Sequence, residues 1–143
     1  MTKTAFLFAG QGAQYLGMAR DLYERYDVVK ATFEEASQVL GYDVRALIDQ
    51  DEEKLNQTRY TQPAILTTSL AIYRLLGEKG IRPDMVAGLS LGEYSALVAA
   101  GALDFKTAVA LVAKRGAFME EAAPAGSGKM VAVLNAEVAL IEE

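Results

Sequence analysis

A short pattern of glycine and serine between an apolar run and a helix-like segment constrains the fold of this chain more than any other feature. The apolar residues Met85 to Ala87 lead into Gly88-Leu89-Ser90-Leu91-Gly92, and a helix is predicted from about Leu91 to Ala100. In so sharp a strand-to-helix turn, side chains two residues before and after the serine would collide with neighbouring elements. Glycine is therefore required at both places, and the serine is held exposed in a strained backbone conformation. The pattern predicts a central strand of a parallel sheet, a tight turn and a helix.

The position of Ser90 makes it the candidate nucleophile. At a helix N-terminus the free N–H groups can stabilise an oxyanion, and the N–H of the residue after the serine, here Leu91, is the one that such turns use. A glycine-rich connection with an incidental serine is the alternative, and the pattern alone leaves it open.

The other apolar patterns alternate between strands and helices. Ala5 to Phe8 is typical of a buried strand, closed by Gly10-Gln11-Gly12. The remaining predicted elements are an amphipathic helix from Tyr15 to Leu40 broken near Tyr26-Asp27, a helical turn from Asp43 to Ile48, a polar loop or short helix from Asp49 to Gln57, a helix from Thr61 to Glu78 with Pro63 in its first turn, a helix from Phe105 to Ala122 capped by Asp104, a strand from Met130 to Leu134 and the start of a helix at Glu137 to Glu143. This order predicts an α/β fold with a mostly parallel sheet and flanking helices.

The chain is long enough for one domain, but its patterns predict fewer strands than a complete sheet usually has. Its 143 residues, 52% of them hydrophobic, are sufficient to bury a core. A sheet usually has about four to six strands, however, and the patterns predict fewer. We therefore expect this sequence to be an incomplete part of a larger domain.

Composition excludes several classes of function. Fourteen basic and 19 acidic side chains give a net charge of −5 without a basic run, which argues against nucleic-acid and anionic-membrane partners. The absence of cysteine excludes thiolate chemistry, and without histidine a mechanism that needs imidazole cannot be completed by these residues alone. We expect no metal site. The N-terminal apolar stretch is too short for a signal peptide, and no apolar run approaches the roughly 20 residues of a membrane span. We expect a soluble, cytoplasmic protein.

The turn Gly10-Gln11-Gly12 after the first strand is the second candidate feature. Oxyanion holes on such folds take one N–H from a loop after another strand, and Gln11 would suit that part. Any α/β domain can also use a glycine-rich first turn to start a helix or to bind a phosphate. The dinucleotide pattern G-x-G-x-x-G is not met, because Tyr15 stands where its third glycine is required.

Two polar residues lie where the helical patterns predict burial. Arg115 is three residues after Val112 and four before Met119, on the apolar stripe of its helix. It is either a guanidinium fork for a substrate carboxylate or a structural arginine that snorkels or pairs internally. Gln62 precedes Pro63 at the start of a largely buried helix, where a glutamine often caps its own helix.

Taken together, four motifs in this order resemble the malonyl-CoA:acyl carrier protein transacylases of fatty acid synthesis. They are Phe8-Ala9-Gly10-Gln11-Gly12-Ala13-Gln14, Thr61-Gln62-Pro63-Ala64, Gly88-Leu89-Ser90-Leu91-Gly92-Glu93-Tyr94-Ser95-Ala96-Leu97 and Arg115-Gly116-Ala117-Phe118-Met119. The resemblance implies that Ser90 carries the malonyl group from coenzyme A to the phosphopantetheine thiol of acyl carrier protein. It assigns the malonyl carboxylate to Arg115, the oxyanion to the N–H groups of Gln11 and Leu91, and a supporting place to Gln62. No permanently bound cofactor is implied, and the full-length enzyme is expected to be a monomer.

This chain departs from that family in two respects. Leu89 stands where many members have a histidine, which is not their base. The family's enzymes are also about twice as long, with a catalytic histidine and a further glutamine in the second half.

The family builds a large α/β-hydrolase-like subdomain interrupted by a small ferredoxin-like one. The resemblance implies that residues 1–128 belong to the large subdomain and that residues 129–143 begin the small one. We therefore expect the 143-residue chain alone to be nearly inactive. Two alternatives stay open: a serine hydrolase or thioesterase of α/β-hydrolase type, and a non-catalytic fragment that needs its missing half.

Overall fold

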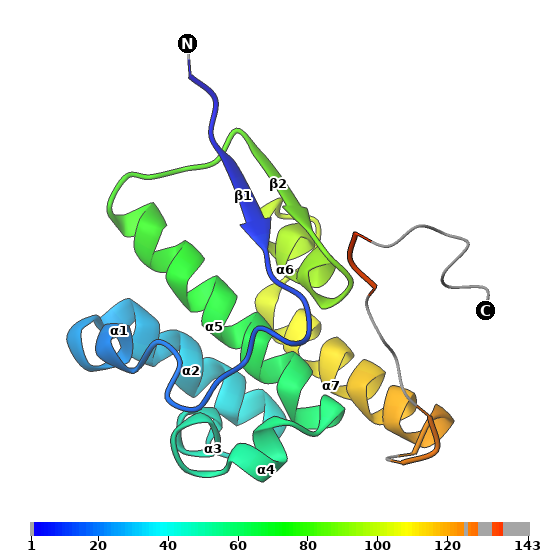
Figure 1. Ribbon diagram of the computed structural model, residues 1–143. Helices are drawn as coiled ribbons and strands as arrows, with labels where there is room; N and C mark the ends of the chain where they lie inside the picture. The colour runs from blue at the N-terminus through cyan, green and yellow to red at the C-terminus, as the bar shows by residue number, and fades with distance from the viewer. Residues whose placement is uncertain (1, 125, 129–132, 136–143) are drawn as a thin grey trace.

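Helices make up most of the computed structural model, which describes residues 2–124, 126–128 and 133–135 (Figure 1). In chain order the elements are β1 (Ala5–Phe8), α1 (Arg20–Arg25), α2 (Asp27–Leu40), α3 (Val44–Gln50), α4 (Glu52–Leu55), α5 (Thr58–Glu78), β2 (Met85–Gly88), α6 (Leu91–Ala99) and α7 (Phe105–Ala122). The predicted strand at 130–134 lies mostly, and the predicted helix at 137–143 wholly, outside the described residues.

The two strands form a parallel pair although most of the helices lie between them in the sequence. Ala5 lies opposite Met85 and Phe8 opposite Gly88. A parallel pair needs a long crossover, and here α1 to α5 supply it. The predicted mixture of parallel strands and flanking helices is therefore confirmed for the described residues.

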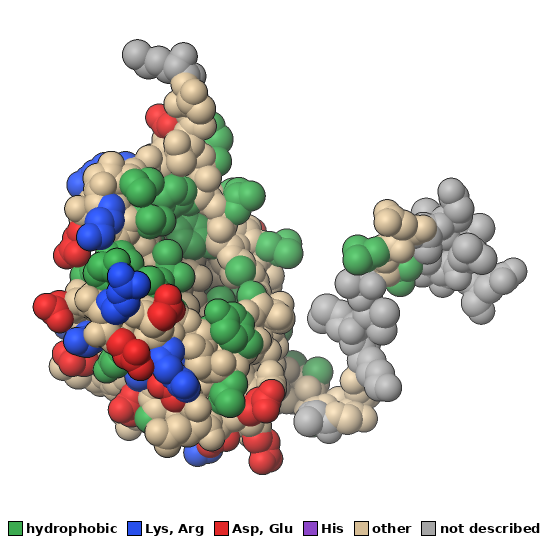
Figure 2. Space-filling model, turned by 60° about the vertical axis from the view of Figure 1, so that its left-hand side comes forward, with side chains coloured by type: hydrophobic (Ala, Val, Ile, Leu, Met, Phe, Trp, Pro, Cys, Tyr) green, Lys and Arg blue, Asp and Glu red, His purple; other side chains and the backbone are tan. Residues whose placement is uncertain are grey.

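The prediction that both strands are buried is wrong. The rings of Phe6 and Phe8 lie 6.2 Å from the ring of Tyr73 on α5, which covers one face of the pair. The other face exposes 80% of Leu7 and 53% of Met85, because no element among the described residues covers it. In Figure 2 hydrophobic side chains gather beneath the N-terminal strand, while acidic and basic side chains intermingle over the helices.

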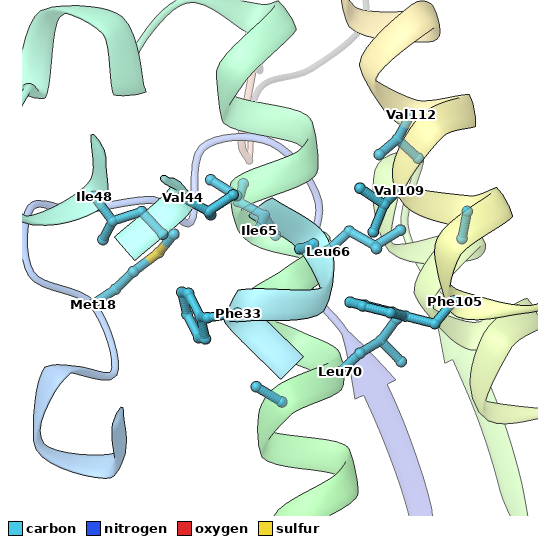
Figure 3. Close-up of a cluster of buried hydrophobic side chains, with 14 of the residues drawn as sticks. Met18, Phe33, Val44, Ile48, Ile65, Leu66, Leu70, Phe105, Val109 and Val112 are labelled. Atoms are coloured by element: carbon cyan, nitrogen blue, oxygen red, sulfur yellow. The ribbon is translucent and has the colours of Figure 1, made fainter. Parts of the chain in front are cut away.

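The core lies between helices rather than on the sheet. α5 runs through the middle of the molecule, with α2 and α7 packed against it (Figure 1). Phe33 of α2, Leu66 and Leu70 of α5, and Val109 and Val112 of α7 are almost fully buried where these helices meet (Figure 3). Burial of α5 on several sides agrees with apolar residues that are not confined to one stripe.

Two helix starts differ from the sequence prediction. The helix predicted from Tyr15 begins only at Arg20, after a turn. The break predicted near Tyr26 is confirmed, because Tyr26 separates α1 from α2. The helix predicted from Thr61 begins at Thr58. Pro63 therefore lies in the second turn of α5 rather than the first, where its missing N–H leaves a carbonyl without its helical partner. The sequence carries no local signal for this start, since Gln57 at the N-cap makes no capping hydrogen bond with its side chain.

A buried arginine joins α3 to the turn before α1. Arg45 is only 6% exposed. Its Nε and Nη2 donate to Asp49 at 2.9 and 2.6 Å, and its Nη1 donates to the Met18 carbonyl at 2.9 Å. The guanidinium also lies over the rings of Tyr23 and Phe33. Asp49 is thus the carboxylate that neutralises a charge inside the fold.

Replacing Asp49 with alanine is expected to lower the free energy of unfolding by about 3 kcal/mol, because it leaves the buried charge of Arg45 unpaired. Burial raises the pKa of Asp49, but hydrogen bonds from Arg45 and Arg20 more than offset this and hold the pKa below its usual 3.8. The stabilisation is therefore full above the usual pKa and is lost as pH falls through the lowered one. Urea unfolding at several pH values measures both effects.

The control for this prediction is Asp27→Ala. Asp27 is fully exposed and pairs with Lys30 at 3.6 Å, so its loss should cost much less than that of Asp49. Equal losses for the two variants would show that the pair of Arg45 and Asp49 contributes no more than an exposed ion pair.

Candidate active site

Ser90 lies on the turn between β2 and α6 in a strained conformation. Its φ of 50° and ψ of −105° are unusual for a residue other than glycine, and the side chain is exposed. Such strain costs about 1–3 kcal/mol and persists only where surrounding structure imposes it. The exposed hydroxyl therefore stands at the start of α6, next to the first N–H groups of that helix.

The two glycines of the motif explain how the turn is held. A Cβ on Gly88 would lie 2.0 Å from the carbonyl carbon and oxygen of Gly92. A Cβ on Gly92 would lie 2.1 Å from the carbonyl oxygen of Phe8. Neither position has room for a side chain, because α6 starts in backbone contact with the ends of both strands.

The loop after β1 approaches the same turn. A Cβ on Gly10 would lie 2.7 Å from the carbonyl oxygen of Leu89, so Gln11 follows a backbone contact with the serine turn. Leu91 is the first residue of α6, and the first N–H groups of a helix have no partner within it. Both backbone donors that the sequence suggested thus lie on segments that meet at Ser90.

Gln62 is placed differently from the helix cap that the sequence allowed. It lies in the second turn of α5, fully buried, and its Nε2 donates to Gln11 Oε1 at 3.3 Å and to the Met119 sulfur at 3.2 Å. Gln11 Nε2 in turn donates to the Thr58 hydroxyl at 3.1 Å. The glutamine therefore joins the Gln11 loop to α7 instead of capping its own helix.

Arg115 reaches Ser90 from α7. Its Nη2 donates to the serine hydroxyl at 3.0 Å, and its guanidinium carbon lies 5.5 Å from the ring centre of Tyr94. Its buried Nη1 has no hydrogen-bond partner among the described residues, and no carboxylate within them pairs with this arginine. The internal ion pair that was one alternative for Arg115 is thus not seen in this part of the chain.

Three further residues take part in this arrangement, and the sequence assigned none of them a role at the site. Thr58 holds the Gln11 side chain, Tyr94 lies under the guanidinium of Arg115, and Met119 accepts a hydrogen bond from Gln62. Only Met119 had a usable signal, because it lies one helical turn after Arg115. A threonine in a polar segment and a tyrosine in a helix follow no pattern that would mark them.

Within the described ranges, histidine, cysteine, aspartate and glutamate form no group of three suited to a metal ion. The same residues include no helix with the length and apolar character that crossing a bilayer requires.

A serine on a strained strand-to-helix turn has the geometry of a nucleophile elbow, and here an arginine lies at its hydroxyl. Residues 5–143 match the acyl transferase domain, and the chain belongs to that family.

Relatives within the family are more specific. The chain is 51% identical over 144 residues to the malonyl CoA-acyl carrier protein transacylase of Bacillus subtilis (strain 168), with 100% of this chain and 45% of that protein covered. It superposes on the crystal structure of MCAT from Streptococcus pneumoniae with a TM-score of 0.91 and 79% identity, over 98% of this chain and 46% of that one.

A third relative was solved with a partner. It is a malonyl-transacylase, PlMCAT, in complex with its type II PKS acyl-carrier protein, with a TM-score of 0.83 and 55% identity over 86% of this chain and 40% of that one. The chain thus spans less than half the length of these relatives.

Proposed function

We propose that this chain, together with the portion that corresponds to the rest of its relatives, transfers a malonyl group from coenzyme A to the phosphopantetheine thiol of acyl carrier protein in fatty acid biosynthesis. This combination is the full-length protein. One observation carries the proposal: the Arg115 guanidinium lies 3.0 Å from the Ser90 hydroxyl. A malonyl thioester has a carboxylate two carbons from the carbonyl that the serine attacks, so one substrate reaches both groups.

In the first half of the reaction, Ser90 Oγ attacks the thioester carbonyl of malonyl-CoA. The N–H groups of Leu91 and Gln11 hold the oxyanion, the C–S bond breaks, and coenzyme A leaves with the proton that the serine gave up. In the second half the carrier thiol attacks the malonyl ester and restores the serine. The base for both steps is the histidine that the family resemblance puts in the second half of its enzymes.

Arg115 selects the substrate. In the free chain its Nη2 is hydrogen-bonded to Ser90, and its Nη1 is buried without a partner among the described residues. An unpaired buried donor is costly, and a malonyl carboxylate would satisfy it with a charge-assisted hydrogen bond. Acetyl groups offer no such acceptor and should react poorly. Malonyl-CoA is therefore substrate, and no permanently bound cofactor is required.

The proposal also covers the subdomains and the oligomeric state of the full-length protein. Residues 1–128 form part of an α/β-hydrolase-like subdomain, residues 129–143 begin a ferredoxin-like one, and the full-length protein is a monomer. Two features support further strands and helices in the larger subdomain. One face of the strand pair exposes Leu7 and Met85, and a groove of about 360 Å³ runs between β1 and α5.

The test uses the full-length protein and the 143-residue chain, each incubated briefly with malonyl-CoA and quenched in acid. A denaturing intact-mass spectrum should show a malonyl adduct on the full-length protein, and addition of holo acyl carrier protein should move the adduct to the carrier. The chain alone should form almost none. An adduct lost equally fast to water with and without the carrier would instead favour a serine hydrolase or thioesterase. If neither the full-length protein nor the chain forms an adduct, the result would favour a non-catalytic fragment.

Replacing Arg115 with alanine is expected to lower kcat/KM for malonyl-CoA about 100-fold, because the substrate carboxylate loses its charged partner. Turnover of acetyl-CoA, slow in both forms, should change little. Steady-state kinetics with both substrates measure this, and Lys114→Ala removes an adjacent exposed charge as a control. Unchanged selectivity in the arginine variant would contradict the assignment of Arg115.

A further inference from the structure

The N-terminus of α5 is capped by a side chain from another helix. Gln57 at its N-cap makes no side-chain hydrogen bond to the helix. Instead, the backbone N–H of Arg59 donates to Glu120 Oε1 of α7 at 3.1 Å, and Arg59 Nε donates to Glu120 Oε2. One carboxylate thus binds a free N–H group and the side chain of the same residue, 61 positions away in the sequence.

A second contact fastens the same part of α7 to the same turn. A Cβ on Gly116 would lie 2.7 Å from the Thr58 carbonyl oxygen and 2.8 Å from the Arg59 Cα. The backbones of α5 and α7 therefore touch at the residue that follows Arg115. Glu120 lies about one helical turn beyond this contact, so the two together fix how α7 lies along α5.

The first turns of α5 also hold the other side of the site. The Thr58 hydroxyl accepts from Gln11, and Gln62 donates to Gln11 and to Met119. These turns are thus a common support for the loop that presents the Gln11 N–H and for the helix that presents Arg115.

Electrostatics favour an ionised Glu120. Burial raises the pKa of its carboxyl, but hydrogen bonds from Arg59 more than offset this, and the pKa is lowered overall. The same hydrogen bond raises the pKa of Arg59. At neutral pH the contact therefore joins a carboxylate to a guanidinium and to the positive end of a helix dipole.

We propose that Glu120 is a positioning residue, whose carboxylate caps α5 from α7 and so holds the Arg115 guanidinium at the Ser90 hydroxyl. This inference rests on the proposed function and extends it to a residue that does not touch the substrate. A misplacement of about 1 Å in an active site can cost 10²-fold in rate, so a shift of α7 along α5 is sufficient to change selectivity.

The test compares Glu120→Ala and Glu120→Gln with Glu121→Gln in the full-length protein. Glutamine at position 120 can still accept from the Arg59 N–H, while alanine removes the cap. Glu121 is the adjacent, exposed acid and makes no hydrogen bond or ion pair within the described residues. Its variant changes charge near Arg59 but removes neither hydrogen bond of the cap.

We expect Glu120→Ala to lower kcat/KM for malonyl-CoA about tenfold, mainly through KM, and to leave acetyl-CoA turnover within about twofold. The kcat/KM of Glu120→Gln for malonyl-CoA should lie between that of the alanine variant and that of the wild type. The kcat/KM of Glu121→Gln should match that of the wild type. An equal fall for both substrates would mean that Glu120 only stabilises the fold, and no fall for either would mean that it positions nothing. Each of these results overturns the proposal.

A second measurement does not depend on turnover. Phenylglyoxal modifies free guanidinium groups, and the rate at Arg115 is read from the mass of its peptide. The rate should be severalfold higher in Glu120→Ala than in the wild type or Glu121→Gln, because Arg115 loses its fixed place at Ser90. Equal modification rates of Arg115 in the wild type and in Glu120→Ala would overturn the positioning role, even if malonyl transfer is found. A wild type that forms no malonyl adduct would contradict the proposed function alone. If the alanine variant does not fold, Glu120→Gln takes its place in both measurements.

Discussion

Replacing Ser90 with alanine in the full-length protein is expected to abolish the malonyl adduct and to lower transfer to the carrier thiol by a factor of about 10⁵ to 10⁶, the size of effect known for loss of a serine nucleophile. The structure supplies the reason, because the hydroxyl is exposed on a strained turn with Arg115 3.0 Å away. The residual rate would come from binding and from the backbone N–H groups of Gln11 and Leu91. Intact-mass spectra and a carrier-transfer assay measure the two quantities.

Ser127→Ala is the control for this prediction. Ser127 is exposed, and its hydroxyl donates to the carbonyl of Pro124 at 2.6 Å, so its loss should leave the adduct and the transfer rate unchanged. The melting temperature of Ser90→Ala should stay close to that of the wild type, since alanine fills no new space. An adduct that persists in Ser90→Ala would place the nucleophile elsewhere.

Replacing Gly92 with alanine is expected to cost about 4 kcal/mol or more and to remove the malonyl adduct as well. The added Cβ would lie 2.1 Å from the Phe8 carbonyl oxygen and 2.9 Å from that of Ala9. Both atoms belong to backbone, so no side-chain rotation relieves the clash. α6 must move away from β1, and this movement would release the strained turn that exposes Ser90.

Gly77→Ala is the matched control, because it makes the same change inside α5, where no described atom beyond the adjacent backbone of the helix lies within 4 Å of the new Cβ. This variant should be more stable by about 0.5–1 kcal/mol, since alanine restricts the unfolded chain. Urea unfolding of both variants measures the difference. If Gly92→Ala unfolds at the same urea concentration as the wild type, the close approach of α6 to β1 is wrong.

Local patterns were sufficient where neighbours in the sequence decide the structure. The strand, turn and helix around Ser90, the break at Tyr26 and the cap of α7 by Asp104 all lie where the sequence predicted them. At the serine turn the glycines act on adjacent backbone, and at α7 the Asp104 side chain accepts from the N–H of Thr107 three residues later. The roles of Ser90, Arg115 and Gln11 in catalysis remain predictions, which the variants above test.

The start of α5 shows where local patterns fail. Its N-cap has no capping side chain, and the carboxylate that binds the Arg59 N–H comes from α7. The role of Gln62 was undetermined for a similar reason, because its partners lie 51 and 57 residues away. No window of sequence contains both members of such a pair.

The sequence by itself determined the alternation of strands and helices, the strained serine turn and the family resemblance, because glycine spacing and apolar periodicity express steric rules that act locally. Only the tertiary structure decided that Arg115 points at Ser90, that Gln62 reaches Gln11, and that Glu120 caps α5. These contacts depend on how α5 and α7 lie against each other, and that arrangement follows from the burial of apolar side chains contributed by distant parts of the chain.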